Sequence, residues 1–260
     1  MLHILQNGTL YGLKNDNGDV IVQPVYHTIN FVDNKQFCLC KSDGYYDCIN
    51  ENGDVFKTLN FRFISQEYFS PDEFLLVSNE TDEIFWNDGD RTNQGKKGLL
   101  DIDLNVVLEP VYNLIDIKSN CILLFSGDEV TRDYTVEDED NPYSYYGIIG
   151  GKWGASDLKG NVLIPLEYDF LQPASNDGVF LANKGGTMIY STDEHGMGGY
   201  SVLGGKWGVI DFNNMIIKEV IYDDYQHHDE KIVLEKYYLP QGDYILINGS
   251  SGFDTFYFKN

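Results

Sequence analysis

Carboxylates are the most abundant groups in this sequence that could take part in chemistry. The chain has 41 Asp and Glu residues against 18 Lys and Arg, a formal net charge of −23 at pH 7. Two carboxylates at the right separation can hydrolyse a glycosidic bond. In a chain this acidic, such a pair could be chosen almost anywhere, so composition identifies none. The charge itself would repel nucleic acid and anionic membranes and would favour a partner with a basic surface.

The cysteines are the next candidates. Cys38 and Cys40 are two residues apart and would share one face of a strand, with Cys48 on the following strand. A thiolate metal site is one interpretation, and small buried hydrophobic side chains are the other. No C-x-x-C motif or suitably spaced histidine accompanies them, which favours the second interpretation. Adjacent His227 and His228 would point to opposite faces of a strand. We therefore predict no metal site and no cofactor; Ca²⁺ binding by the acidic cluster at 137–140 is the alternative to a solvated loop.

Catalytic motifs are missing from the sequence as well. There is no H-E-x-x-H, no G-x-S-x-G and no phosphate-binding loop. Lys152 and Lys206 follow glycines, but a tryptophan comes next where a phosphate loop needs Ser or Thr. The sequence thus predicts a non-enzymatic protein with no catalytic residues.

A recurring pattern organises the elements that must position any site. Residues 204–211 read Gly-Gly-Lys-Trp-Gly-Val-Ile-Asp, and related copies start near residues 11, 46, 97, 153 and 207. In four copies the motif glycine is followed, fourteen residues later, by a tyrosine: 12 to 26, 98 to 112, 154 to 168 and 208 to 222. Recurrence on this scale indicates a repeat architecture.

Each part of the pattern predicts a piece of β-structure. The aromatic residue and its neighbours form a strand, and the glycine lets another backbone approach closely. Pairs such as Asn17-Gly18 predict tight hairpin turns. Proline then marks an edge or bulge of the next strand, and a further apolar strand follows in most copies. Each copy is therefore expected to form a meander of three or four strands that packs against its neighbours.

These motifs resemble the WG repeat of bacterial proteins over about residues 5–236. The match is strongest in the copies at Trp153 and Trp207 and degenerate in the earlier ones. The resemblance implies an all-β protein of five WG-type meander repeats, propeller-like, forming a single domain over residues 1–260; an open β-solenoid or arc is the alternative. It also implies a role in binding and transfers no catalytic residue.

Insertions distinguish the copies. A tight turn at 41–44 is replaced by longer segments at 79–96, 126–150, 183–203 and 236–244. Insertions at one position of a repeat emerge on one face, commonly the binding face, although they could also be hairpins that only lengthen each sheet. Aromatic anchors and carboxylates in these segments predict a partner-binding surface. The candidate residues are Phe85, Trp86, Glu137, Asp138, Glu139, Asp140, Tyr143, Tyr145, Tyr146, Tyr190, Glu194, Tyr200, Tyr237 and Tyr238.

The sharpest functional hypothesis is an acidic immunity or inhibitor protein that neutralises a basic bacterial toxin or nuclease. The alternatives are a carboxylate-based enzyme acting on glycans or peptides, and a structural or sugar-binding module. The N-terminal residues lack a secretory signal pattern, and no apolar run reaches the length of a membrane span. We therefore expect a cytoplasmic protein that binds neither nucleic acid nor membrane; its oligomeric state is left open.

Overall fold

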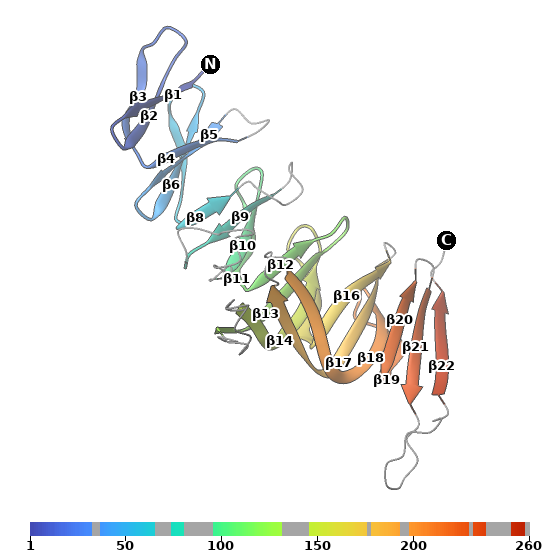
Figure 1. Cartoon of the computed structure of the whole chain (residues 1–260). Coiled ribbons are helices and arrows are strands. Elements are labelled where there is room, and N and C mark those ends of the chain that lie inside the picture. Colours follow the sequence, from blue (N-terminus) through green and yellow to red (C-terminus); the bar gives the residue numbers. More distant parts are fainter. Residues whose placement is uncertain are drawn as a thin grey trace. The chain divides into compact units, whose positions relative to one another are not determined.

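The computed structural model describes residues 1–32, 37–65, 74–80, 96–131, 146–175, 178–192, 198–228, 231–237 and 251–257. For 65, 128–131, 146–149, 175, 189–192, 198–201, 226–228, 231–237 and 251–257 it describes the backbone alone. All regular elements in these ranges are β-strands, so the all-β prediction is confirmed (Figure 1). Within the same ranges no helix could cross a membrane. The chain divides into two compact units, which we describe separately.

The first unit comprises Met1–Ile84 and Gly95–Val111 and contains three antiparallel sheets. The first sheet has β1 (His3–Asn7), β2 (Leu10–Lys14) and β3 (Val20–Tyr26). The second has β4 (Thr28–Phe31), β5 (Phe37–Ser42), β6 (Tyr45–Asn50) and β7 (Val55–Leu59). The third has β8 (Phe63–Ser65), β9 (Phe74–Ser78), β10 (Lys97–Asp101) and β11 (Val106–Tyr112).

The second unit comprises Phe85–Gln94 and Tyr112–Asn260 and contains two sheets. The larger joins two four-stranded meanders. One has β12 (Leu114–Ile117), β13 (Ile122–Thr131), β14 (Tyr146–Ser156) and β15 (Val162–Tyr168), and the other has β16 (Phe170–Ser175), β17 (Val179–Thr192), β18 (Gly198–Asp211) and β19 (Ile216–Tyr222). A three-stranded sheet follows, with β20 (Asp224–His228), β21 (Lys231–Tyr237) and β22 (Ser251–Tyr257).

The sheets begin and end at a different point from the sequence copies, which corrects the prediction that each copy is one meander. The strand with the Trp-Gly position is the third strand of a four-stranded meander, as in β6, β14 and β18. The apolar strand expected to end each copy instead pairs with the Trp-Gly strand of the next copy, as β17 does with β18. Between Tyr168 and Phe170 a single residue, Asp169, turns the chain. Each sequence copy therefore spans two meanders.

The motif glycine faces a bulge in the fourth strand, as the sequence predicts. Between the pairs Trp153–Tyr168 and Ala155–Ile164, β15 advances by two more residues than β14. A Cβ added to Gly154, which lies between these two pairs, would stand 2.5 Å from the carbonyl oxygen of Ile164. No side chain fits there.

The second copy has no glycine at this position and no bulge opposite it. Asp47 stands at the glycine position, and β6 pairs regularly with β7 from Tyr46 through Cys48. β7 has five residues where β3, β11, β15 and β19 have seven, so the bulge is not formed beside Asp47. The carboxylate instead accepts hydrogen bonds from Tyr26 Oη (2.9 Å) and Thr58 Oγ1 (2.7 Å).

An Asx residue holds each predicted hairpin turn. Asp157 Oδ1 accepts the backbone N–H groups of Lys159 and Asn161, both at 2.8 Å, and Gly160 adopts a φ of 84°. The equivalent acceptors in the other copies are Asn15, Asn50, Asp101 and Asp211. Where glycine is missing, Leu104 and Asn214 take the positive φ.

The core of the second unit lies between its meanders and contains both motif tryptophans. Trp153 and Trp207 are 2% and 7% exposed and belong to one cluster. Phe170 contacts both, with ring centroids 5.8 and 6.0 Å away. The tryptophans of neighbouring copies thus share a partner ring.

In the first unit the cysteines are part of the core, as expected for small hydrophobic side chains. Cys38 and Cys40 pack with Leu13 on one side of their sheet, and their Sγ atoms are 3.6 Å apart. Cys48 packs with Tyr46 in the cluster on the other side. The three thiols therefore do not converge on one point.

Candidate protein-binding hairpins

The corner after the closing tyrosine is held by a carboxylate. Asp169 Oδ1 pairs with Lys152 Nζ at 2.5 Å, and its Oδ2 accepts the backbone N–H of Gly185 at 2.7 Å. Its side chain is only 12% exposed. Asp223 pairs with Lys206 at the next corner. The motif lysine and the aspartate after the closing tyrosine thus fasten the third strand of one meander to the start of the next.

Two buried amides hold the same region. Asn113 Oδ1 accepts the N–H of Gly127 at 2.8 Å. Asn183 is fully buried; its Oδ1 accepts the N–H of Gly186 at 3.1 Å, and its Nδ2 donates to the carbonyl of Gly204 at 3.2 Å. Each amide therefore forms hydrogen bonds with the backbone of glycines in the hairpins.

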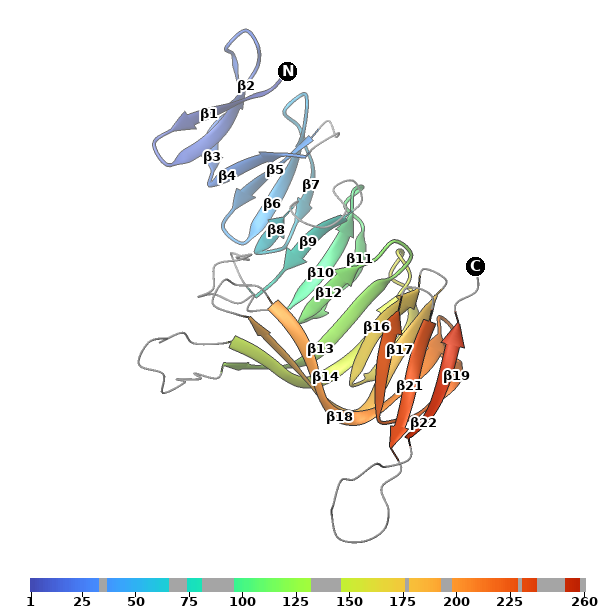
Figure 2. The same cartoon turned by 45° about the vertical axis from the view of Figure 1, so that its right-hand side comes forward.

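Two glycine pairs bend the hairpins. Gly150, Gly151, Gly204 and Gly205 have φ values from 71° to 80°, a region that disfavours other residues. At Gly151 an added Cβ would also stand 2.5 Å from Phe125 Cζ. The glycine pair of the Gly-Gly-Lys-Trp-Gly motif is thus a backbone bend, and β18 curves strongly in both views (Figure 1 and Figure 2).

Beyond the bends, the two hairpins pair with each other. β13 pairs with β14 out to Thr131 and Tyr146, and β17 pairs with β18 out to Thr192 and Gly198. The outer part of β14 then pairs with β17 through residues 147–149 and 189–191. This contact makes one sheet of the two meanders (Figure 2). We call the outer strand segments 128–131, 146–149, 187–192 and 198–203 the hairpin platform.

The predicted binding residues fall into two groups. Tyr146, Tyr190, Tyr200 and Tyr237 lie in described strands by their backbone, and Tyr190 and Tyr200 are cross-strand neighbours. The others lie outside the described residues: Phe85, Trp86, Glu137, Asp138, Glu139, Asp140, Tyr143, Tyr145, Glu194 and Tyr238.

The insertions follow the second strand of their meanders, at the place where the first unit has its short turn at 43–44 between β5 and β6. Their common position is confirmed. Much of 126–150 and 183–203 is paired strand, so these two insertions include hairpins that lengthen the sheet, the alternative given for them. Asp169, Asn113 and Asn183 were not among the predicted residues, although the Tyr-Asp that closes the last two copies indicates the corner carboxylate.

Polar contacts of Glu167 and Tyr168 in β15 also join the two meanders. Tyr168 Oη donates to Asn214 Oδ1 at 2.7 Å, and Asn214 Nδ2 donates to Glu167 Oε1 at 2.7 Å. Lys184 Nζ lies 4.4 Å from the centre of the Tyr168 ring. Burial, and next the charge of Glu167, raises the pKa of Tyr168 to about 12. Tyr168 is therefore a neutral structural hydrogen-bond donor at physiological pH.

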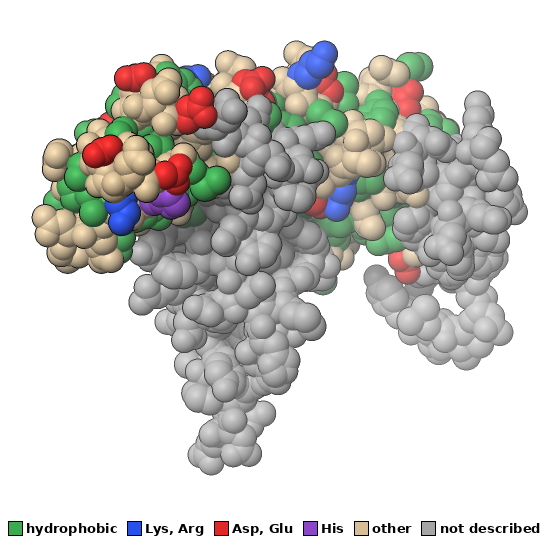
Figure 3. Space-filling view, turned by 90° about the horizontal axis from the view of Figure 1, so that it is seen from above, with side chains coloured by type: hydrophobic (Ala, Val, Ile, Leu, Met, Phe, Trp, Pro, Cys, Tyr) green, Lys and Arg blue, Asp and Glu red, His purple; other side chains and the backbone are tan. Residues whose placement is uncertain are grey.

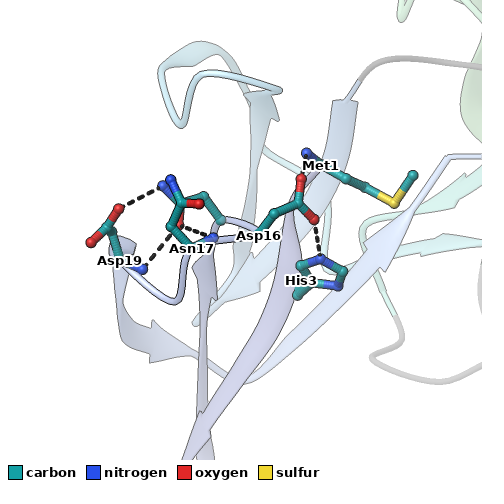
Figure 4. A network of polar contacts seen from close by, with 6 residues as sticks. Met1, His3, Asp16, Asn17 and Asp19 are labelled. Carbon is teal, nitrogen blue, oxygen red and sulfur yellow. Dashed lines mark hydrogen bonds and ion pairs between the residues drawn. The ribbon is translucent and has the colours of Figure 1, made fainter.

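A second polar cluster lies on the surface of the first unit (Figure 4). Asp16 Oδ2 accepts a hydrogen bond from the N-terminal amine of Met1 at 2.7 Å, and Asp16 Oδ1 lies 2.8 Å from His3 Nε2. The hydrogen bond from the amine, followed by that from His3, lowers the pKa of Asp16. All three side chains are largely exposed to water. Nothing in this cluster forms an enclosed site.

The described surface offers carboxylates and apolar groups side by side (Figure 3). Among the described residues, no group of His, Cys, Asp and Glu is arranged to hold a metal ion. Leu203, in β18 beside the bend, is 62% exposed. Charged and apolar side chains are thus the groups that this part of the surface exposes.

The fold and these hairpins define an all-β protein built from meander repeats. A family model described as the WG containing repeat matches residues 11–46 and 153–187. The chain therefore contains WG repeats, with one matched region in each unit.

Two further comparisons add little. No curated protein matches the chain. The solved structure titled "Crystal structure of the eukaryotic initiation factor" is similar over 90% of this chain and 78% of that one, at 9% identity and a TM-score of 0.29. A likeness at that score supports no argument about fold or function.

Proposed function

We propose that this chain is a non-enzymatic binding protein whose hairpin platform engages a protein with a basic surface. The observation that carries the proposal is the lateral pairing of two glycine-bent hairpins, β13–β14 and β17–β18. Near the bends, Met188 and Val202 of the outer segments still pack into the core cluster of the second unit. Farther out, the described contact between the two hairpins is the backbone pairing of β14 with β17. This pairing supplies a firm backbone support for the segments that connect the strands.

Charge indicates the chemistry of the partner. The chain carries a net charge of −23, and acids cluster in the sequence at 137–140, between β13 and β14. Electrostatic attraction to a basic surface would speed association, and aromatic residues would supply the anchors that slow dissociation. A basic toxin or nuclease neutralised in the cytoplasm is the most specific partner of this kind. The four free, buried cysteines suit that reducing compartment.

The test replaces residues 128–149 with Ser-Asp-Gly, the turn sequence at 42–44. This change removes the outer part of one hairpin and keeps the bend at Gly150 and Gly151. Partners captured by the immobilised wild-type chain would be purified, and their affinities would be measured with a biosensor at low and high salt. We expect the affinity of the wild-type chain to fall steeply with salt. The shortened variant should bind the partner at least tenfold more weakly.

Two controls make this result specific. Lys159→Ala changes an exposed residue at the opposite end of β14 and should bind normally. Cytochrome c, a basic protein with no designed fit, should bind far more weakly than the captured partner. Equal affinity of the folded, shortened variant would remove the hairpin platform from the binding site.

A further inference from the structure

The strand that follows the Trp-Gly strand in each copy presents apolar side chains to solvent. Its first residue is β-branched in all five copies and 46–64% exposed: Val20, Val55, Val106, Val162 and Ile216. These strands, β3, β7, β11, β15 and β19, are also edge strands of their meanders in the described chain. Exposed apolar edge strands invite pairing with another chain, and proteins usually block them.

Most of these edges carry a block. β3, β11 and β15 contain Pro24, Pro110 and Pro165, which have no N–H to offer a new strand. The shorter β7 has Lys57, whose Nζ donates to the carbonyl of Leu104 in the next hairpin turn at 2.6 Å. Proline or a lysine on the edge is a common protection against strand addition.

The edge of β19 has no proline, and its lysine, Lys218, blocks only a strand that does not place a carboxylate opposite it. Glu219 follows Gly208 by eleven residues, as Pro165 follows Gly154, and it restores a backbone N–H at that position. β19 pairs with β18 through Ile216, Lys218 and Tyr222, so Glu219 lies in the bulge between two of these pairs. Met215 and Ile216 are 64% and 62% exposed, and Ile217 and Ile221 are 38% and 37% exposed.

The sequence of this strand is complementary to itself. Residues 216–221 read Ile-Ile-Lys-Glu-Val-Ile. In an antiparallel pair centred between Lys218 and Glu219, each lysine faces the glutamate of the second copy. Ile217 then faces Val220, and Ile216 faces Ile221. Opposite charges and β-branched pairs directly across strands are the favourable cross-strand combinations.

We propose that β19 is a self-association edge, where two copies of this chain pair their β19 strands antiparallel about a two-fold axis. A two-fold contact uses the same patch on both copies, which a self-complementary strand satisfies. One strand from each copy buries less surface than a standard protein interface, so the dimer is weak and reversible, with a dissociation constant above about 1 μM.

Net charge sets the salt dependence of this dimer. Each copy carries a charge of −23, so long-range repulsion opposes association and salt screens it. The dimer therefore strengthens with salt, whereas binding of a basic partner to the hairpin platform weakens. This opposite sign separates failure of the dimer from failure of the proposed function.

The test is analytical ultracentrifugation of the full chain from about 5 to 500 μM, at low and high salt. Glu219→Pro introduces the residue that the fourth copy carries in the equivalent bulge, so the fold should accept it. We expect at least a tenfold weaker dimer. Glu109→Pro, which follows Gly98 by eleven residues in β11, is the matched control and should dimerise like wild type.

A charge exchange tests the register without proline. Lys218→Glu places glutamates opposite each other and should weaken the dimer about tenfold. Lys218→Glu combined with Glu219→Lys restores opposite charges across the axis and should recover association. A wild-type chain that stays monomeric throughout the concentration range overturns the proposal, as does a double variant no better than the single one.

Discussion

Asp169 shows how much one side chain of the repeat can do. Its two carboxylate oxygens bind a lysine from the third strand of one meander and a backbone N–H from the second strand of the next. The corner therefore depends on one residue of the motif, and its lysine partner is the residue that gives Gly-Gly-Lys-Trp-Gly its charge.

Replacing Asp169 with Ala should lower the free energy of unfolding by about 1–3 kcal/mol. The partly buried hydrogen bond from the N–H of Gly185 to a charged acceptor would be lost, which is the costly part of the loss. Urea denaturation followed by tryptophan fluorescence measures the change. Lys152→Met is the control, because it removes the ion pair but leaves that hydrogen bond; it should cost less than about 1 kcal/mol. Equal losses in the two variants would contradict the assignment.

A second prediction at the residue scale concerns how Tyr168 makes the folding stability depend on pH. Its pKa in the folded chain is about 12, above its ordinary value of 10.0. Between these pH values the unfolded state loses the phenol proton first, so the folded state loses stability as pH rises. Tyr168→Phe should therefore show a smaller fall in stability from pH 10 to pH 12 than wild type. Denaturation midpoints across this range test it, and parallel curves would show that Tyr168 is not the group responsible.

At the scale of elements, the match between glycine and bulge governs each hairpin. Gly154 faces a fourth strand with two extra residues, whereas Asp47 faces a strand without them. The fourteen-residue spacing from glycine to tyrosine is thus the length of a bulged hairpin. In the second copy the fourth strand is shorter and has no such bulge, so a side chain, that of Asp47, fits at the glycine position.

Gly154→Ala should destabilise the second unit by about 2 kcal/mol or more. The added methyl group would stand 2.5 Å from the Ile164 carbonyl oxygen, so backbone must move. Thermal unfolding with a matched control, Thr187→Ala at an exposed site in the neighbouring β17, measures the difference. The control should stay within about 0.5 kcal/mol of wild type. An alanine variant as stable as the control would mean that the bulge accommodates a side chain.

At the scale of the molecule, the propeller-like arrangement that the WG resemblance implies stays a prediction. Within each unit successive meanders share a core, and in the second unit Asp169 and Asp223 form single-residue corners between them. A closed, compact particle of this length has a radius of gyration of about 18 Å. Small-angle X-ray scattering should give a value near this. A markedly larger value with an elongated distance distribution would favour the open solenoid.

The sequence by itself determined the parts that depend on local chemistry. Turns at Gly18 and Gly160, the bulge opposite Gly154 and the buried positions of Trp153 and Trp207 all follow from backbone freedom or apolar bulk. These requirements act within a few residues of the chain, so the repeat pattern carries them directly.

Tertiary structure alone decided where each sheet begins and what the insertions become. A sequence repeat has no marked start, and the meander boundary falls at Asp169, where β15 stops pairing with β14 and β16 begins to pair with β17. The hairpin platform required the bends at Gly151 and Gly205 to bring β14 beside β17. Such pairing joins strands that are distant along the chain, and no local pattern records which distant strand will be the neighbour.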